Sequence, residues 1–408
     1  SVFDGIRRPD NPEINYYYPT QDLVTAPEIL FFWVARMVMA GYEYRNEKPF
    51  ENVYLTGIVR DKQRRKMSKS LGNSPDPLEL IEKYGADGVR VGMLLSSPAG
   101  NDLMFDEDLC QQGKNFVNKI WNATRLISGW EVAETEQPEH ARLGLDWFEN
   151  KLQQSLIEIE DHFSKYRISD ALMTTYKLVW DDFCSWLLEI LKPEYGQPID
   201  KMSYQSLIEH FESLLKLLHP FTPFITEEVW HSLKERSDND VLIVARWPEK
   251  QKLDERVVEA FEEAKELISE IRRFRQEKNV SYKTPLELKL SEPNHQIGIF
   301  DAILRKMAGL STASQVEKHN EAGYAFRVRT SEYFIPIAAD SINSEEELEK
   351  MTKELQHAED FLKSVRAKLN NERFINNAPA EVVDKERQKE ADALKKIEIL
   401  KRSIAALN

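Results

Sequence analysis

The chain has 408 residues, and its 55 Lys and Arg against 69 Asp and Glu give a formal net charge of −14. At roughly 100 to 200 residues per domain, this length predicts two to four domains and excludes a single small module. The acidic total also excludes broad, nonspecific binding of nucleic acid, so any RNA contact must come from local basic patches.

Cysteine content and hydropathy restrict the class of protein further. Cys110 and Cys184 are the only cysteines, too few for a disulfide framework or a four-cysteine zinc site. We therefore expect a reducing, cytoplasmic location and no metal bound by this chain. The most apolar stretch, residues 29–40, falls short of the roughly 20 residues that a bilayer span needs, so we expect no membrane segment. The first residues lack both Met and a signal-peptide pattern, which we interpret as an internal cut in a longer protein.

Residues 1–107 have the pattern of a parallel α/β unit. Residues 22–26 predict a short strand, and Pro27 with Glu28 then marks the first turn of a helix that should end at Gly41. The helix is apolar on all sides, which predicts burial against a sheet. The β-branched run 53–59 predicts a second, buried strand, and strand, helix and strand together make a βαβ unit.

Residues 108–248 change to helical periodicity. Apolar side chains recur at helical spacing and predict a bundle of four or five helices: Phe116, Ile120, Trp121, Leu152, Leu156, Ile159, Phe163, Leu172, Val179, Phe183, Leu187, Ile190, Leu207, Phe211, Leu214 and Leu218. Segment 219–230, HPFTPFITEEVW, predicts a turn that feeds another helix. Residues 241–244 predict a short strand.

Residues 249–340 predict a small α/β unit. A long charged helix is expected over residues 254–278. Segments 286–290 and 333–337 alternate apolar and polar residues, which is typical of half-buried strands.

Residues 341–408 carry two apolar seams. From Leu348 to Leu369 apolar residues step by three and four, the a/d pattern of a coiled coil, and a second seam runs from Ala393 to Leu407. The short segment 376–379 between them predicts an antiparallel coiled-coil hairpin. A seam used for dimerisation is the alternative.

A basic loop follows the predicted strand 53–59. Residues 60–70, RDKQRRKMSKS, contain six basic side chains and one acid, Asp61. Ligands bind at the carboxyl ends of strands in open α/β sheets, and flexible lysines suit a clamp on a polyphosphate. A solvated basic loop is the alternative, and composition alone does not choose between the two.

A second basic patch lies on the predicted helix 254–278 and just after it. Arg272, Arg273 and Arg275 are basic, as are Lys278 and Lys283, with Phe274 and Tyr282 interleaved. This composition is compatible with contact to an RNA backbone, and equally with a solvated helix face.

Several segments, in order, resemble one family. Lys66 to Ser70 spell KMSKS, the signature of class I aminoacyl-tRNA synthetases, and its surroundings resemble the valyl members of that family. The other matching segments are FFWVARM (31–37), KYGADGVR (83–90), NKIWNATR (118–125), HPFTPFITEEVW (219–230) and RFINNAPAEVVDKER (373–387). The resemblance implies ATP-dependent activation of valine, with Mg²⁺, and its transfer to tRNA(Val), by a protein expected to be monomeric.

The resemblance also implies a division of the chain. Residues 1–107 would be part of a Rossmann-type α/β catalytic domain, and 108–248 an all-α, helical anticodon-binding domain. Residues 249–340 would be a small α/β linker domain, and 341–408 an antiparallel coiled-coil arm that binds tRNA.

Site residues follow from the same resemblance. Lys66 and Lys69 would be catalytic contacts to the ATP phosphates, and Met67, Ser68 and Ser70 would complete the ATP-binding loop. Trp33 resembles a tryptophan of the amino-acid pocket, although a core tryptophan in a buried helix is the alternative.

We expect structural roles for two further residues, and two others depart from the family's usual pattern. We expect Asp87 to cap the helix that it begins and Arg90 to bond back to the lysine loop. The family usually has Gly and Asp where this chain has Ala26 and Glu28, which leaves no basis for an adenosine contact there.

Other functions remain open at this stage. Isoleucyl and leucyl enzymes share KMSKS, and a non-catalytic RNA-binding fragment is a further alternative. The family's HxGH motif is absent, since no two of the eight histidines lie three residues apart. We therefore expect this chain to be the C-terminal portion of the enzyme and to be inactive alone.

Overall fold

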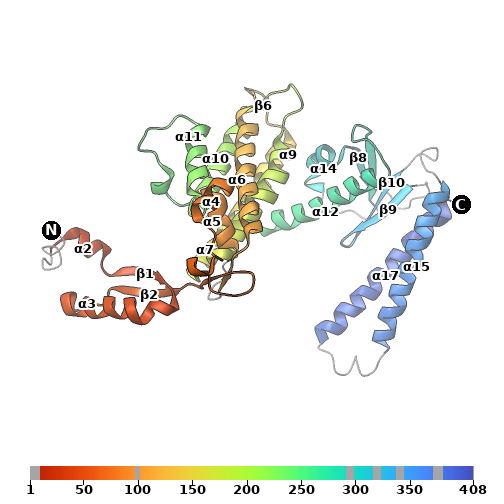
Figure 1. Cartoon of the computed structure of the whole chain (residues 1–408). Helices are drawn as coiled ribbons and strands as arrows, with labels where there is room; N and C mark the ends of the chain where they lie inside the picture. The colour runs from red at the N-terminus through yellow and green to blue at the C-terminus, as the bar shows by residue number, and fades with distance from the viewer. Residues whose placement is uncertain are drawn as a thin grey trace. The chain divides into compact units, whose positions relative to one another are not determined.

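The computed structural model describes residues 10–96, 102–290, 298–315, 323–336, 344–370 and 380–407. These residues form two compact units that divide between Glu255 and Arg256 (Figure 1). Each unit is described by itself.

The first unit begins with the predicted strand–helix–strand element. Helix α2 (Pro12–Tyr17) precedes strand β1 (Thr20–Thr25), which pairs in parallel with β2 (Phe50–Leu55). Between the strands run a 3₁₀ turn, η1 (Pro27–Ile29), a π-helical turn, η2 (Leu30–Val34), and helix α3 (Ala35–Arg45).

Two details of this helix differ from prediction. Gly41 lies inside α3, and the helix ends instead at Arg45, followed by Asn46 as its C-cap with a left-handed φ of 55°. Gly41 is present because a Cβ there would lie 2.7 Å from the Tyr18 hydroxyl, so it permits close packing and does not end the helix.

The predicted burial of this helix is also wrong. Phe31, Phe32 and Trp33 are 81%, 65% and 54% exposed. The physical reason is the width of the sheet, since β1 and β2 form a two-stranded sheet among the described residues and cannot cover a helix that is apolar all round.

The predicted strand 53–59 is in fact two strands. Strand β2 ends at Leu55, and β3 (Val59–Arg60) pairs in parallel with a different partner, β4 (Leu103–Met104). The basic loop follows β3 and leads through η3 (Lys69–Leu71) to helices α4 (Pro77–Tyr84) and α5 (Ala86–Leu95).

The rest of the first unit contains the predicted bundle. Its helices are α6 (Glu107–Ser128), α7 (Glu139–Ser164), α8 (Ile168–Lys177), the π-helical η4 (Leu178–Leu187), α9 (Leu188–Leu191), α10 (Lys201–Leu218) and α11 (Pro223–Leu233). Short strands β5 (Val132–Ala133) and β6 (Ile199–Asp200) pair in parallel. Phe116, Phe183 and Phe211 are fully buried, as periodicity predicts for a bundle core, whereas Trp121, predicted with them, is 38% exposed.

The strand predicted at residues 241–244 is a 3₁₀ turn, η5 (Leu242–Val244). The N–H of Leu242 donates to the Glu227 carboxylate, at 3.0 and 3.2 Å to its two oxygens. A side chain therefore takes the donor that a neighbouring strand would have used.

The second unit begins with α12 (Glu255–Glu277), close to the predicted bounds. A four-stranded sheet follows, in the order β8 (Leu310–Gln315), β7 (Leu286–Leu290), β10 (Ser331–Pro336) and β9 (Gly323–Val328), together with helix α14 (Asp301–Ala308). Strand β7 coincides with the predicted strand 286–290, and β10 contains residues 333–336 of the predicted strand 333–337, whose last residue lies outside the described residues. Sequence reasoning missed α14, β8 and β9, because these segments are short and β8 is built mainly of small polar residues.

Two long helices complete the second unit. Helix α15 (Ser344–Leu369) and helix α17 (Ala380–Leu407) lie side by side and run in opposite directions (Figure 1). Ala358 and Leu362 of α15 pack against Ala393, Ile397 and Leu400 of α17. The predicted connection, residues 376–379, lies outside the described residues.

Among the described residues, no helix is both long and apolar enough to cross a membrane.

Candidate nucleotide and RNA sites

The basic loop begins as a tight hairpin. Arg60 and Lys66 form an isolated antiparallel bridge, and the N–H of Asp61 donates to the Arg65 carbonyl at 2.9 Å. Arg64 takes a left-handed φ of 65° at the turn. The chain thus reverses within six residues, so Lys66 lies opposite Arg60.

Asp61 organises this hairpin. Its carboxylate accepts from the backbone N–H groups of Gln63 and Arg65, at 3.0 and 2.9 Å, and from the side chains of Arg65 and Asn73, at 2.8 and 2.9 Å. The Asn73 hydrogen bond, followed by those of Arg65, holds the pKa of the Asp61 carboxyl well below its usual range. Asp61 is therefore ionised and fully used within the loop.

Asn73 closes the other end of the loop. Its Oδ1 accepts from the Ser68 N–H at 2.9 Å, and its Nδ2 donates to the Lys66 carbonyl at 3.3 Å as well as to Asp61. Sequence reasoning missed both Asn73 and the role of Asp61. The sequence pair Gly72-Asn73 is typical of a turn and could have indicated this one, since Gly72 has a positive φ of 62°.

The residues of the KMSKS signature differ in what they contact. Met67 packs against a buried cluster of Leu80, Tyr84, Leu103, Phe105 and Cys110, so its side chain anchors the loop. The hydroxyls of Ser68 and Ser70 lie 3.1 Å apart, and Ser68 Oγ accepts from the Leu71 N–H at 3.3 Å. Lys69 is the first residue of η3.

Three cations of the loop have carboxylate partners from other elements. Lys66 Nζ lies 2.6 Å from Glu28 Oε2 in η1, and Lys62 Nζ lies 3.0 Å from Asp106. Arg60 pairs with Asp102. These pairs are partly exposed, so each is weak and exchangeable.

Trp33 lies in the same irregular helix as Glu28. Its indole is 54% exposed, and the Arg36 guanidinium lies 4.5 Å from the ring centroid. Within this chain, Trp33 is therefore not a core residue. Trp33 belongs to the π-helical turn η2, a type of irregularity that is frequent at functional sites.

Asp87 does not cap its own helix. It is 5% exposed and accepts from the backbone N–H groups of Phe224 and Ile225, at 3.4 and 2.7 Å, so it caps the start of α11. Burial raises the pKa of its carboxyl, and these two hydrogen bonds oppose that rise. The predicted cap on α5 is wrong because α5 begins after Gly85, with Asp87 already inside it.

Arg90 does not bond to the lysine loop. Its guanidinium donates to the carbonyls of Pro220 and Phe221, both at 3.0 Å. Asp87 and Arg90 together attach α5 to the turn before α11. Contact between segments 130 residues apart has no signal in a single sequence.

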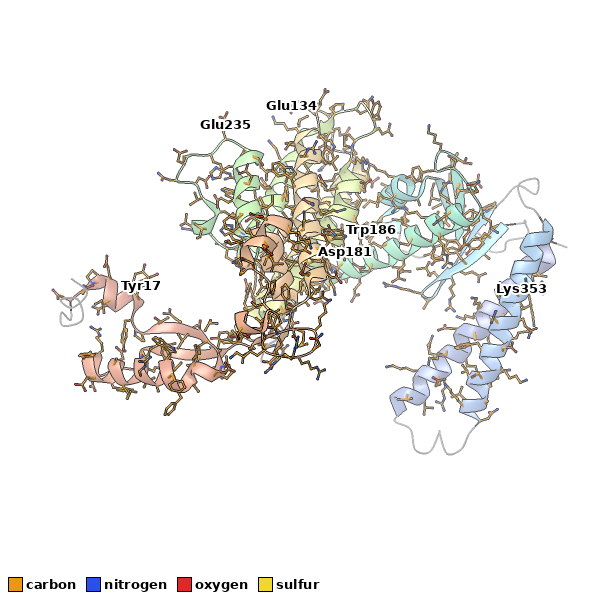
Figure 2. The ribbon with its side chains drawn as sticks, in the orientation of Figure 1. Tyr17, Glu134, Asp181, Trp186, Glu235 and Lys353 are labelled. Atoms are coloured by element: carbon orange, nitrogen blue, oxygen red, sulfur yellow. The ribbon has the colours of Figure 1, made fainter. Side chains whose placement is uncertain are left out.

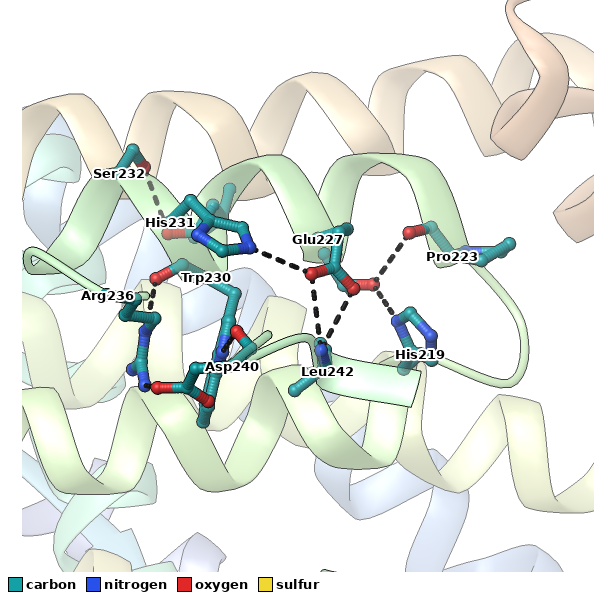
Figure 3. A network of polar contacts seen from close by, with 11 residues as sticks. His219, Pro223, Glu227, Trp230, His231, Ser232, Arg236, Asp240 and Leu242 are labelled. Atoms are coloured by element: carbon teal, nitrogen blue, oxygen red, sulfur yellow. Dashed lines mark hydrogen bonds and ion pairs between the residues drawn. The ribbon is translucent and has the colours of Figure 1, made fainter. Parts of the chain in front are cut away.

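Figure 3 shows the polar network around that turn. His219 Nδ1 lies 2.8 Å from Thr226 Oγ1, and Glu227 Oε1 lies 3.1 Å from His231 Nε2. Burial lowers the pKa of His219. Segment 219–230 is thus a structural joint between α10, α11 and η5.

The second basic patch is not one exposed surface. Arg275 is 5% exposed, and its guanidinium donates to the carbonyls of Ser281, Thr284, Ala308 and Gly309. Arg272 donates to the Met307 carbonyl at 3.2 Å. Residues three apart share a helix face, and this face holds the segment around α14. Arg273 is half exposed but pairs with Glu270 at 2.5 Å and with Glu277 at 3.7 Å.

Metal binding has no candidate group in the part of the chain that the structure describes. No cluster there of three or more His, Cys, Asp or Glu side chains could hold a metal ion.

Three family models match successive parts of the chain. Residues 5–106 match class I tRNA synthetases (I, L, M and V), residues 146–290 match the anticodon-binding domain of tRNA ligase, and residues 343–408 match the valyl tRNA synthetase tRNA binding arm.

Curated relatives match the whole chain. A protein named valine–tRNA ligase in Christiangramia forsetii is 59% identical to this chain, over 100% of the chain and 47% of the relative. A protein of the same name in Phocaeicola vulgatus is 56% identical, over 100% of the chain and 46% of the relative. A valine–tRNA ligase of Fusobacterium nucleatum is 34% identical over 96% of this chain and 46% of the relative. The chain thus spans about half the length of these proteins.

One solved structure aligns with part of this chain: the LeuRS of Agrobacterium radiobacter K84, in a ternary complex with tRNA and LeuAMS. The alignment covers 59% of this chain and 29% of that chain, at 21% sequence identity and a TM-score of 0.43.

The three family models in order and the relatives that match the entire chain agree with one another. The chain therefore belongs to the class I tRNA synthetases, among the valine–tRNA ligases.

Proposed function

We propose that this chain is part of an enzyme that activates valine with ATP and transfers it to tRNA(Val). The observation that carries the proposal is the ordered KMSKS loop at the end of β3, in a chain whose relatives at 56–59% identity are named valine–tRNA ligase. Valine, ATP and tRNA(Val) would be its substrates, with Mg²⁺ accompanying ATP.

In the activation step, a valine carboxylate oxygen bonds to the α-phosphorus of ATP while the bond to the leaving pyrophosphate breaks. Negative charge then grows on the pyrophosphate. Lys66 and Lys69 would stabilise that charge as point cations, an interaction that is stronger in the transition state than with bound ATP. Lys66 would first have to leave Glu28, which its exposed ion pair permits.

The other signature residues would have supporting roles. Ser68 and Ser70 carry hydroxyls that could bind a phosphate oxygen, whereas Met67 has its side chain in the core and could offer only its backbone. Trp33, exposed on η2, would form part of the valine pocket.

The remaining segments would bind tRNA. The match at 146–290 supports an anticodon-binding role for the bundle, assigned to residues 108–248, and the match at 343–408 supports a coiled-coil tRNA-binding arm over residues 341–408. Residues 249–340 would be a linker domain. Residues 1–107 would be part of a Rossmann-type catalytic domain, and the enzyme would be a cytoplasmic monomer.

The test is amino-acid-dependent exchange of pyrophosphate into ATP by the full-length protein. We expect exchange with valine and little with leucine or isoleucine. Exchange that favours leucine or isoleucine would contradict the proposal and support the corresponding alternative. Binding of tRNA without any exchange would support the non-catalytic alternative.

A further inference from the structure

A tyrosine follows the end of helix α7 in a conformation that glycine usually takes. Helix α7 ends at Ser164, and Tyr166 has a left-handed φ of 57°. The N–H of Tyr166 donates to the Phe163 carbonyl at 3.0 Å, and the N–H of Arg167 donates to the His162 carbonyl at 2.8 Å. This pair of hydrogen bonds is the Schellman motif, whose left-handed position favours glycine because glycine has no Cβ. The turn by itself therefore does not explain the tyrosine side chain.

The Tyr166 side chain contacts both strands of the β1–β2 sheet. Its ring stacks on Tyr54 of β2, with the ring centroids 5.6 Å apart and the ring planes inclined by 20°. Its hydroxyl donates to Asp22 Oδ1 of β1 at 2.5 Å, the length of a strong hydrogen bond to a carboxylate. Asn52 of β2 donates to the same oxygen at 3.0 Å. Figure 2 shows the side chains that project from β1, β2 and α7. One side chain thus joins a helix end of the bundle to two strands.

Both strands continue into segments that carry the candidate site. Strand β1 leads into η1, which contains Glu28, and into η2, which contains Trp33. Strand β2 leads into β3 and the KMSKS loop. Elsewhere in the first unit, Asp87 and Arg90 attach α5 to the bundle. Tyr166 gives the β1–β2 sheet a separate attachment to the same bundle.

We propose that Tyr166 is a positioning residue that fixes the β1–β2 sheet against the bundle, so that tRNA held by the bundle presents its 3′ end to activated valine. The proposal rests on the proposed function, in which residues 108–248 bind the anticodon and residues 1–107 carry the catalytic site. Tyr166 acts through Asp22 and Tyr54 and touches no substrate. The attachment matters because a small rotation of the bundle displaces a distant 3′ end, and misplacing reacting groups by about 1 Å can cost a hundredfold in rate.

The experiment replaces Tyr166 with glycine in the full-length enzyme. Tyr166→Gly removes both side-chain contacts and supplies the best residue for the left-handed turn, so the end of α7 should fold at least as well. The matched control is Asn279→Gly. Asn279 has a φ of 53° after α12, the N–H groups of Asn279 and Val280 make the same pair of hydrogen bonds, and its side chain is exposed. Circular dichroism verifies that both variants fold.

We expect Tyr166→Gly to lower kcat for the attachment of valine to tRNA(Val) about tenfold. The KM for tRNA(Val), and valine-dependent pyrophosphate exchange without tRNA, should each change less than about twofold, because the binding surfaces and the activation site stay intact. Asn279→Gly should match the wild type in all three measurements.

Two conservative variants separate the contacts of Tyr166. Tyr166→Phe keeps the stacked ring and loses the hydrogen bond, so kcat for attachment should fall about threefold. Asp22→Asn keeps an acceptor for the hydroxyl and should stay within about twofold of the wild type.

A Tyr166→Gly enzyme with the wild-type kcat would overturn the proposal and make Tyr166 an ordinary helix end. Equal losses of exchange and attachment would also overturn it, because Tyr166 would then support the catalytic segment as a whole. A higher KM for tRNA(Val) with an unchanged kcat would make Tyr166 an RNA contact instead. The wild-type enzyme tests the proposed function separately: if it did not attach valine to tRNA(Val), that function would be wrong and the positioning role with it.

Discussion

The signature loop and the helix pair are held by different interactions. The loop depends on one carboxylate and one amide, Asp61 and Asn73, which satisfy the backbone donors of a short hairpin. The helix pair depends on an apolar seam that is distributed over more than forty residues. Single substitutions should therefore affect the loop through chemistry and geometry, and the helix pair through folding.

The largest expected effect is that the 408-residue chain by itself does not activate valine. Its sequence lacks HxGH, the other half of the family's triphosphate site. We expect no valine-dependent exchange of pyrophosphate into ATP by the 408-residue chain. Robust exchange by the purified chain would show that the loop suffices and would contradict our mechanism.

Next in size is Lys69→Ala in the full-length enzyme. Loss of a cation that acts on charge developing in the transition state should lower the rate of valine activation roughly a hundred- to a thousandfold. Valine affinity should change little. The measurement is pyrophosphate exchange at saturating valine, and Lys62→Ala serves as a control in the same loop. If valine affinity collapsed while the rate at saturation stayed unchanged, Lys69 would be a binding residue.

Disruption of the helix pair should separate the two halves of the reaction. Leu362 is 8% exposed in the seam, and proline there should cost about 3 kcal/mol or more by breaking α15. We expect Leu362→Pro and deletion of residues 341–408 to weaken tRNA(Val) affinity and aminoacylation while valine activation stays nearly intact. Unchanged tRNA affinity in both, with a change of oligomeric state in sedimentation, would favour a dimerisation seam.

Asp61→Ala should reduce activation about tenfold, because the hairpin loses four hydrogen bonds to one carboxylate while Lys66 and Lys69 remain. Since the pKa of Asp61 is lowered in the folded chain, its stabilising effect is present above the ordinary carboxyl pKa near 4 and is lost as pH falls through the lowered value. The ratio of wild-type to variant activity should thus be constant between about pH 6 and 8. A ratio that varied across this range would indicate another titrating group.

The smallest expected effect is at the joint between α5 and α11. Asp87→Ala removes the cap from two backbone N–H groups of α11 and should lower the free energy of unfolding of the chain by about 1 to 2 kcal/mol. Urea denaturation followed by circular dichroism measures this. Asp76→Ala, which removes the cap of α4, is the matched control, and an equal loss in the control would mean that the joint adds nothing beyond an ordinary cap.

Periodicity and local signals in the sequence determine much of the fold. The bundle core at Phe116 and Phe211, helix α12 and the seam around Leu362 follow from spacing alone, because a helix or strand repeats every few residues and apolar side chains must be buried. The KMSKS loop was also evident from its residues and from its place after a strand.

Only the tertiary structure decides which residues meet. Arg275 belongs to a basic run in the sequence but bonds four carbonyls inside the second unit, and Asp87 caps a helix that begins 136 residues later. Trp33 lies in a segment whose pattern predicts burial, yet it is 54% exposed in this chain. Burial and long-range hydrogen bonds are properties of packed elements, and no local pattern records which elements will pack together.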